Sequence, residues 1–160
     1  MLTYPEENYK KHFVKDHIFQ NISLYDVYKI LYSPESKYLP SIMEIRQDFD
    51  TKFELKENSI TNIPNPQNIT SYNYTMIHPI SDDRKVLFGP KQINISDEYR
   101  IFFENENKFF VEVTTNSSGF MLIDTFISRS LFVYEQKEKD VILNIKYDME
   151  FIKFNPFIKL

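Results

Sequence analysis

The sequence contains no cysteine, no tryptophan and only two glycines in 160 residues. Without cysteine the chain has no disulfide, no thiolate metal ligand and no cysteine nucleophile. Two glycines leave little room for flexible linkers, and the length is most simply that of one domain with its own core.

An excess of positive charge is also lacking, since the formal net charge is −4 and no sustained basic run occurs. A protein that binds the phosphate backbone of a nucleic acid is usually basic, so we expect no nucleic-acid partner. No stretch approaches the roughly 18 apolar residues of a membrane-spanning helix. The N-terminus is polar and acidic, whereas a signal peptide is apolar, so we expect a cytoplasmic protein.

Aromatic residues are abundant instead, with 15 phenylalanines and 11 tyrosines, and such residues favour strands. From residue 48 onward apolar and polar side chains alternate, most clearly between Phe49 and Leu55. Turn residues divide this part into six or seven strands, which predicts an antiparallel meander. A sheet with one apolar face must curl around a covering layer.

Two short helices are predicted before that sheet. A first strand is expected over residues 17–22, and Ser23 followed by Asp26 is typical of a helix start. The first helix has its apolar stripe within residues 24–31, and the second ends near Arg46. The fold class is therefore α+β, with a polar lead-in over residues 1–15, loose at its start, and a domain over residues 16–160.

Several short motifs occur in an order that identifies a family. They are LYSPES at residues 31–36, YTMIHPI at 74–80, FGPK at 88–91, DTF at 124–126 and EFIK at 150–153. Together they resemble the VASt domain, the StART-like sterol-binding module of the Lam/Ysp and Aster proteins at membrane contact sites. The FGPK segment contains the most recognisable tripeptide of that family.

The resemblance implies a StART-like helix-grip fold, in which a curved sheet and helices enclose a sterol or related lipid. It implies lipid transfer between membranes without chemistry, hence no enzyme, no cofactor, no catalytic residue and no metal. The partners would be the lipid and, transiently, a membrane surface. The location would be the cytoplasm at endoplasmic-reticulum contact sites, within a larger protein or complex.

The sequence departs from the family pattern in three respects, of which the first is that the GRAM domain and the transmembrane anchor of many relatives do not occur in it. A tryptophan usual in the family is replaced near Leu55, and the long C-terminal helix expected after Pro156 is missing because the sequence ends at Leu160. A sheet without that helix would expose apolar surface, so we expect self-association or a partner helix if Leu160 is the true end of the chain.

The lipid is expected to contact inward positions of the long strands, namely Phe126, Phe132, Tyr147 and Met149. Which face points inward does not follow from one sequence, so these residues could equally be ordinary core. For Arg129 two placements stay open, one beside the pocket and one in a cross-strand pair on the surface.

The resemblance places a lid over the cavity in the loop between the two helices, at Tyr32, Ser33, Pro34 and Lys37. A plain connection between helices is the equally acceptable interpretation. Two other functions stay open for the whole chain. One is an interaction module with a filled interior, which docks to a protein or membrane. The other is a helix-grip enzyme, which would need convergent ionisable groups in a pocket, and the three scattered histidines suggest none.

Overall fold

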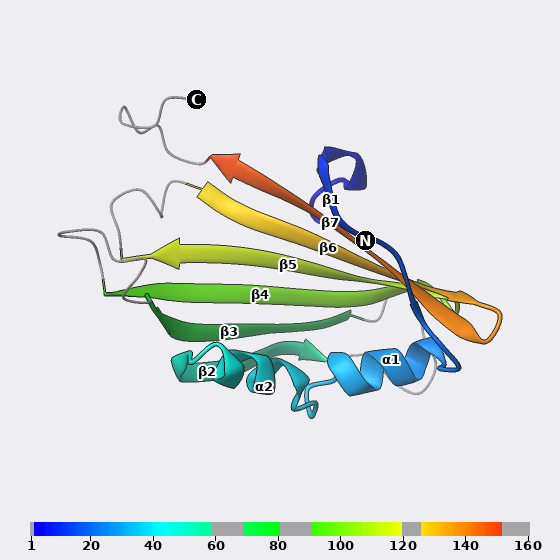
Figure 1. The fold of residues 1–160 in the computed structure, drawn as a ribbon, viewed down its shortest axis with the longest axis horizontal. Coiled ribbons are helices and arrows are strands. Elements are labelled where there is room, and N and C mark those ends of the chain that lie inside the picture. Colours follow the sequence, from blue (N-terminus) through cyan, green and yellow to red (C-terminus); the bar gives the residue numbers. More distant parts are fainter. Residues whose placement is uncertain (1, 59–68, 81–90, 120–125, 152–160) are drawn as a thin grey trace.

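Seven antiparallel strands form one curved sheet, in the order β1-β7-β6-β5-β4-β3-β2 (Figure 1). The computed structural model describes residues 2–58, 69–80, 91–119 and 126–151. The strands are β1 (Lys11–Phe19), β2 (Phe49–Asn58), β3 (Ile69–Pro79), β4 (Gln92–Asn105), β5 (Lys108–Ser118), β6 (Phe126–Lys137) and β7 (Asp140–Phe151). The edge strands β1 and β2 stand at opposite ends of this order, so the sheet is open.

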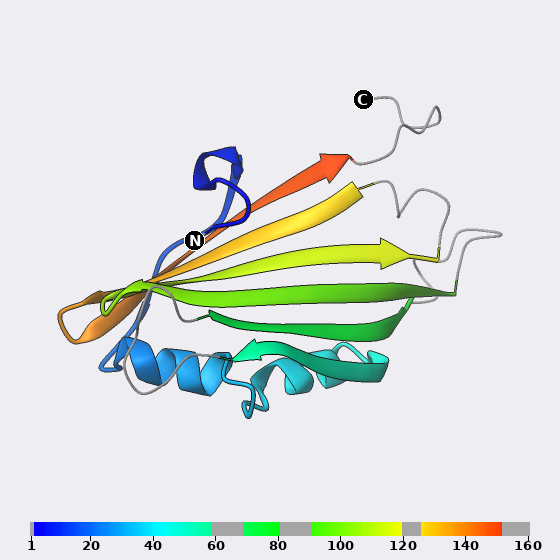
Figure 2. The same cartoon turned by 180° about the vertical axis from the view of Figure 1, so that it is seen from behind.

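Helices α1 (Leu24–Leu31) and α2 (Tyr38–Ile45) connect the two edge strands, and a 3-10 helix, η1 (Glu6–Asn8), precedes β1. In Figures 1 and 2, α1 and α2 lie end to end along one side of the sheet, and η1 lies on the other. Helix α1 begins as its sequence predicts, because the Ser23 hydroxyl accepts a hydrogen bond from the Asp26 backbone N–H at 3.1 Å.

The strand register divides the side chains between two faces. Phe103 pairs with Phe109, and Phe109 pairs with Tyr134, so these three rings lie on one face. They belong to a core cluster that also contains Leu24 and Val27 of α1, and we call this side the helix face. Alternation along each strand sends the intervening residues to the opposite face.

The opposite face has its own small core, which the N-terminal segment, residues 2–10, covers. Tyr9 packs there against Phe102, Phe110, Leu131 and Val133. The alternation that builds the helix face therefore creates a second apolar surface, and the start of the chain shields it from water.

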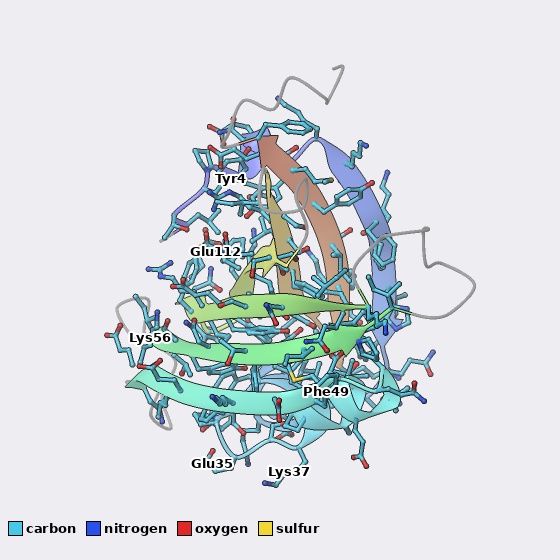
Figure 3. All side chains as sticks on the ribbon, turned by 90° about the vertical axis from the view of Figure 1, so that its left-hand side faces the viewer. Tyr4, Glu35, Lys37, Phe49, Lys56 and Glu112 are labelled. Atoms are coloured by element: carbon cyan, nitrogen blue, oxygen red, sulfur yellow. The ribbon has the colours of Figure 1, made fainter. Side chains whose placement is uncertain are left out.

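Polar contacts hold the N-terminal segment in place. The backbone N–H and hydroxyl of Thr3 donate to the buried carboxylate of Glu112, at 2.9 and 2.7 Å from Oε2. The Tyr4 hydroxyl donates to Asp148 at 2.5 Å, and Lys146 pairs with Glu6 at 3.0 Å. Figure 3 shows Tyr4 and Glu112 far from Glu35 and Lys37, which lie on the side of the helices.

The predicted α+β architecture with two short helices and a curved antiparallel sheet is confirmed, with seven strands. Two details were wrong. The first strand spans Lys11–Phe19 and not residues 17–22, and residues 2–10 are packed and not loose. The polar composition of this segment suggested a loose lead-in, because the residues that it binds lie more than 100 positions away along the chain. The domain division at residue 15 stays a prediction. The region of the expected C-terminal helix and the Gly-Pro pair at residues 89–90 lie outside the described residues.

Replacing Tyr9 with alanine should lower the free energy of unfolding by about 3 kcal/mol, because a buried ring leaves a void in the opposite-face core. Urea denaturation measures the change. Phe13→Ala is the matched control, since the Phe13 side chain is 75% exposed, and it should shift stability by no more than about 0.5 kcal/mol. Equal effects of the two substitutions would contradict the packing of this segment.

Candidate functional site

A cavity of about 540 Å³ lies between the two helices and the helix face of the sheet. Its wall on the helix side comes from α1, α2 and the segment that joins them. Its floor comes from β4, β5, β6 and β7, and Phe19 of β1 closes one side. A volume in this range is typical of pockets for small organic ligands.

Most of the cavity wall is apolar. Helix α1 contributes Leu31, and helix α2 contributes Tyr38, Leu39 and Ile42. The strands contribute Val113, Phe132, Leu143 and Ile145. Such a lining attracts a ligand through the hydrophobic effect, which is not directional and leaves orientation to a few polar groups.

Four polar residues interrupt this lining: Asp97, Thr115 and Ser130 from the strands, and Arg46 from the end of α2. Asp97 is only 6% exposed, and the Thr115 hydroxyl donates to its Oδ1 at 2.6 Å. Burial raises the pKa of the Asp97 carboxyl above its ordinary value, and the Thr115 hydrogen bond and the Arg46 charge oppose that rise. The cavity thus has one strongly polar end.

Arg46 is held at the rim of the cavity by a buried carboxylate. Its Nε and Nη2 both donate to Oδ2 of Asp48, at 3.0 and 2.5 Å, and the Asp48 side chain is fully buried. The other oxygen of Asp48 lies 2.6 Å from Nδ1 of His78 on β3. This chain of contacts ties the end of α2 to the sheet.

Three tyrosines anchor the opposite end of the cavity wall. The hydroxyls of Tyr32 and Tyr134 lie 2.5 Å apart, and the Tyr72 hydroxyl donates to the Tyr32 backbone carbonyl at 3.1 Å. All three rings are buried. Burial raises the pKa of Tyr32 and of Tyr134, so both phenols stay neutral under physiological conditions.

The predicted lid residues divide into two kinds. Tyr32 caps α1 and forms part of the cavity wall. Ser33 and Pro34 are half-buried, and Lys37 is exposed at the start of α2. The Ser33 hydroxyl donates to the Lys29 carbonyl at 2.8 Å, which extends the end of α1 by local bonding.

The predicted lipid contacts share one face of the sheet by register. Phe132 lines the cavity and pairs with Ile145. Tyr147 and Met149 follow Ile145 on the same face of β7, and Met149 is 46% exposed. Phe126 begins β6, and its side chain lies outside the part that the structure describes. A role for these residues in binding stays a prediction.

The sequence analysis missed Asp97 and Arg46. A signal for Asp97 was present, since Ile95, Asp97 and Tyr99 alternate along β4 and place a carboxylate in an apolar row. Arg46 ends a helix, where a basic residue is ordinary, so nothing marked it. Arg129 lies on the opposite face, where it pairs with Glu150 at 2.8 Å, which confirms the surface placement.

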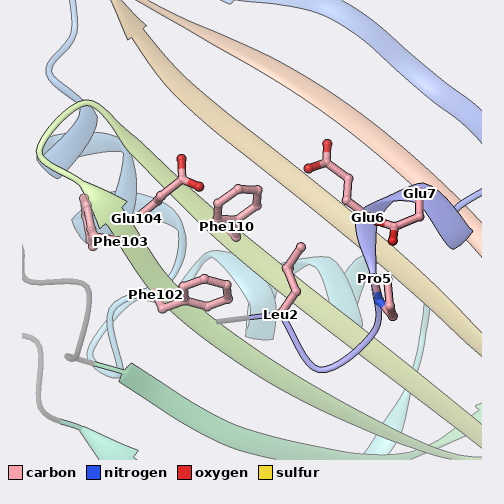
Figure 4. A pocket seen from close by; sticks show the side chains of 8 residues that line it. All are labelled: Leu2, Pro5, Glu6, Glu7, Phe102, Phe103, Glu104 and Phe110. Atoms are coloured by element: carbon pink, nitrogen blue, oxygen red, sulfur yellow. The ribbon is translucent and has the colours of Figure 1, made fainter.

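A second cavity of about 400 Å³ lies on the opposite face, between the N-terminal segment and β4 and β5 (Figure 4). Phe102 and Phe110 form its floor, and Glu6, Glu7 and Glu104 surround it. Two of these carboxylates already have partners, Lys146 for Glu6 and Lys108 for Glu104. The cavity beneath the helices is larger and more apolar, so it is the candidate site.

Two kinds of feature are absent from residues 2–58, 69–80, 91–119 and 126–151. No helix in these ranges is both long and apolar enough to cross a membrane. Within the same ranges, no three His, Asp or Glu side chains are grouped as metal ligands would be.

An open antiparallel sheet that holds helices over an apolar cavity defines the helix-grip class of ligand-binding domains. The family model described as VASt, the VAD1 Analog of StAR-related lipid transfer domain, matches residues 14–160. The chain therefore belongs to the VASt family of lipid-binding domains. A search of curated proteins found no match.

Replacing Tyr134 with phenylalanine should lower the free energy of unfolding by about 1–3 kcal/mol, because the buried Tyr32 hydroxyl loses its partner. Tyr32→Phe should cost a similar amount. The double variant should cost less than the sum of the two, because it removes both hydroxyls of one hydrogen bond. Urea denaturation of all four proteins measures this, and strictly additive losses would show that the two hydroxyls do not interact.

The raised pKa of Asp97 predicts a pH dependence of stability. Between the unfolded value of 3.8 and the higher folded value, the folded state binds the proton more tightly, so stability falls as pH rises through this window. In the Asp97→Asn variant no carboxyl titrates at this position, so this loss of stability does not occur. Its stability relative to the parent protein should therefore increase as pH rises above 3.8 and then level off.

Urea denaturation at a series of pH values tests this expectation. Glu98→Gln is the matched control. Glu98 is the exposed neighbour of Asp97, and its substitution removes the same charge from the opposite face. A difference between Asp97→Asn and the parent that stays constant with pH would contradict the assignment.

Proposed function

We propose that this domain binds a sterol or a related lipid in the cavity beneath its helices and transfers it between membranes at contact sites. The observation that carries the proposal is an apolar cavity of about 540 Å³ in a domain of the VASt family. A lipid of this kind brings a large apolar surface, and burial of apolar surface is worth roughly 25 cal/mol per Å².

In this proposal Phe132 contacts the bound lipid inside the cavity, and Phe126, Tyr147 and Met149 extend the apolar path along β6 and β7. The exposed side chain of Met149 supports such a path, because a lipid that enters along the strands would cover it. Binding needs no chemistry, so the proposed protein is a carrier and not an enzyme.

The segment between α1 and α2 is the proposed lid. Tyr32 is fixed by its hydroxyl contact with Tyr134, so the movement falls to Ser33, Pro34 and Lys37, which carry less buried surface. Lys37 would meet an anionic membrane surface during exchange. The proposed location is the cytoplasm at endoplasmic-reticulum contact sites, within a larger protein or complex.

The interaction module considered above expects a filled interior. The cavity volume favours lipid binding over that alternative, because the interior of a module without a ligand would be closely packed with side chains. Apolar side chains such as Phe53 and Phe151, each close to half exposed, support self-association or a partner helix as an addition to lipid binding.

Filling the cavity tests the proposal. Val113 lies in the cavity floor at 9% exposure, and Val113→Phe should lower the affinity for dehydroergosterol, a fluorescent sterol, at least about tenfold, because a ring occupies space that the ligand needs. The fluorescence anisotropy of the sterol measures binding, and transfer between liposomes measures exchange.

The neighbouring position provides the control. Thr114 follows Val113 on β5 and faces the opposite side, so Thr114→Phe adds a similar ring outside the cavity and should leave binding unchanged. Circular dichroism shows whether both variants are folded. A folded parent protein that binds no sterol would overturn the proposed function in favour of the interaction module.

A further inference from the structure

The polar end of the cavity contains a carboxylate oxygen without a donor. Asp97 lies in the lining with 6% of its surface exposed, and the Thr115 hydroxyl satisfies its Oδ1. Among the residues that the structure describes, no donor forms a hydrogen bond with Oδ2 of Asp97. Oδ2 is not among the described side-chain atoms that are sealed from solvent without a partner, so it is accessible from the cavity and can accept a hydrogen bond from a ligand.

The positive charge nearest this carboxylate is directed elsewhere. Arg46 lines the same cavity and affects Asp97 through its charge, but its Nε and Nη2 donate to Asp48. His78 also binds Asp48 and not Asp97. The charged groups around α2 therefore satisfy one another and leave Asp97 as the acceptor that faces the cavity.

We propose that Asp97 is the specificity-determining residue of the cavity and that it selects lipids with a free hydroxyl group, whose O–H donates to Oδ2. This inference rests on the proposed function, since it names the chemistry of the ligand in the same cavity. Apart from Arg46, Thr115 and Ser130, the rest of the lining is apolar or aromatic. Asp97 is the one carboxylate among the described lining residues, so it is the strongest acceptor available to orient and select such a lipid.

An analogue without the donor should be rejected. A lipid whose hydroxyl is methylated has almost the same shape and keeps an acceptor oxygen, but it displaces water from Asp97 and offers no hydrogen in return. An unpaired buried acceptor weakens binding by about tenfold or more. Sites built to bond a hydroxyl discriminate in this way against analogues that lack it.

The experiment compares dehydroergosterol with its 3-methyl ether on the whole 160-residue chain, with anisotropy of the sterol as the readout. The parent protein should prefer the alcohol about tenfold or more. Asp97→Leu should remove this preference, because it replaces the acceptor with an apolar side chain. Glu98→Leu, the matched change on the opposite face, should keep it.

Asp97→Asn provides a second variant that keeps the shape of the side chain and the bond from Thr115. Its amide N–H can donate to the ether oxygen, so the preference should fall below that of the parent protein. Equal binding of alcohol and ether by the parent, or an undiminished preference in both Asp97 variants, would overturn the inference and leave the proposed function standing. Binding of neither probe by the folded parent would instead overturn the proposed function, and the inference with it.

Discussion

Two helices of eight residues each must cover the apolar face of a seven-stranded sheet, and they are too short to fill it. At roughly 1.5 Å per residue each helix spans about 12 Å, whereas strands of 11–14 residues in the centre of the sheet are about three to four times as long. The helices seal the region over Phe103 and Phe109, where the core is fully buried. Farther along the strands, beneath α2 and the end of α1, side chains leave space unfilled, and the cavity lies there.

The helices are held by polar groups at both ends of this cavity. Tyr32, at the end of α1, lies against Tyr134 and Tyr72, and Arg46, at the end of α2, is tied to the sheet through Asp48. The tyrosine anchor consists of buried hydrogen bonds, and the Arg46 anchor is a charged pair with a buried carboxylate and a partly exposed guanidinium. A buried hydrogen bond costs more to break than it contributes when formed. The cavity is therefore bounded by these two anchors, and the short segment between Tyr32 and α2 is held by local hydrogen bonds from Ser33 and Ser36 to carbonyls of α1.

On the other face of the sheet the N-terminal segment, with its short 3-10 helix η1, provides the cover. Tyr9 supplies apolar contact, and Thr3 donates to Glu112, a carboxylate that also pairs with Arg100 at 3.0 Å. A buried carboxylate with two partners is a strong positional constraint. The sheet is thus packed on both faces, but only the helix face encloses a cavity whose polar end contains an acceptor without a donor.

Most elements of this fold could be predicted from the sequence, because alternation and helical periodicity are local patterns. The Ser23 cap, the stripe of α1 and the strands from Phe49 onward could all be read from neighbouring residues. The family also followed from the sequence, since its motifs are short and ordered. The face that contains the cavity follows from the three-dimensional packing, because a one-residue shift in the register of a strand moves all its side chains to the other face. The partners of Asp97, Tyr32 and Thr3 lie 18, 102 and 109 positions away, so no local pattern could have paired them.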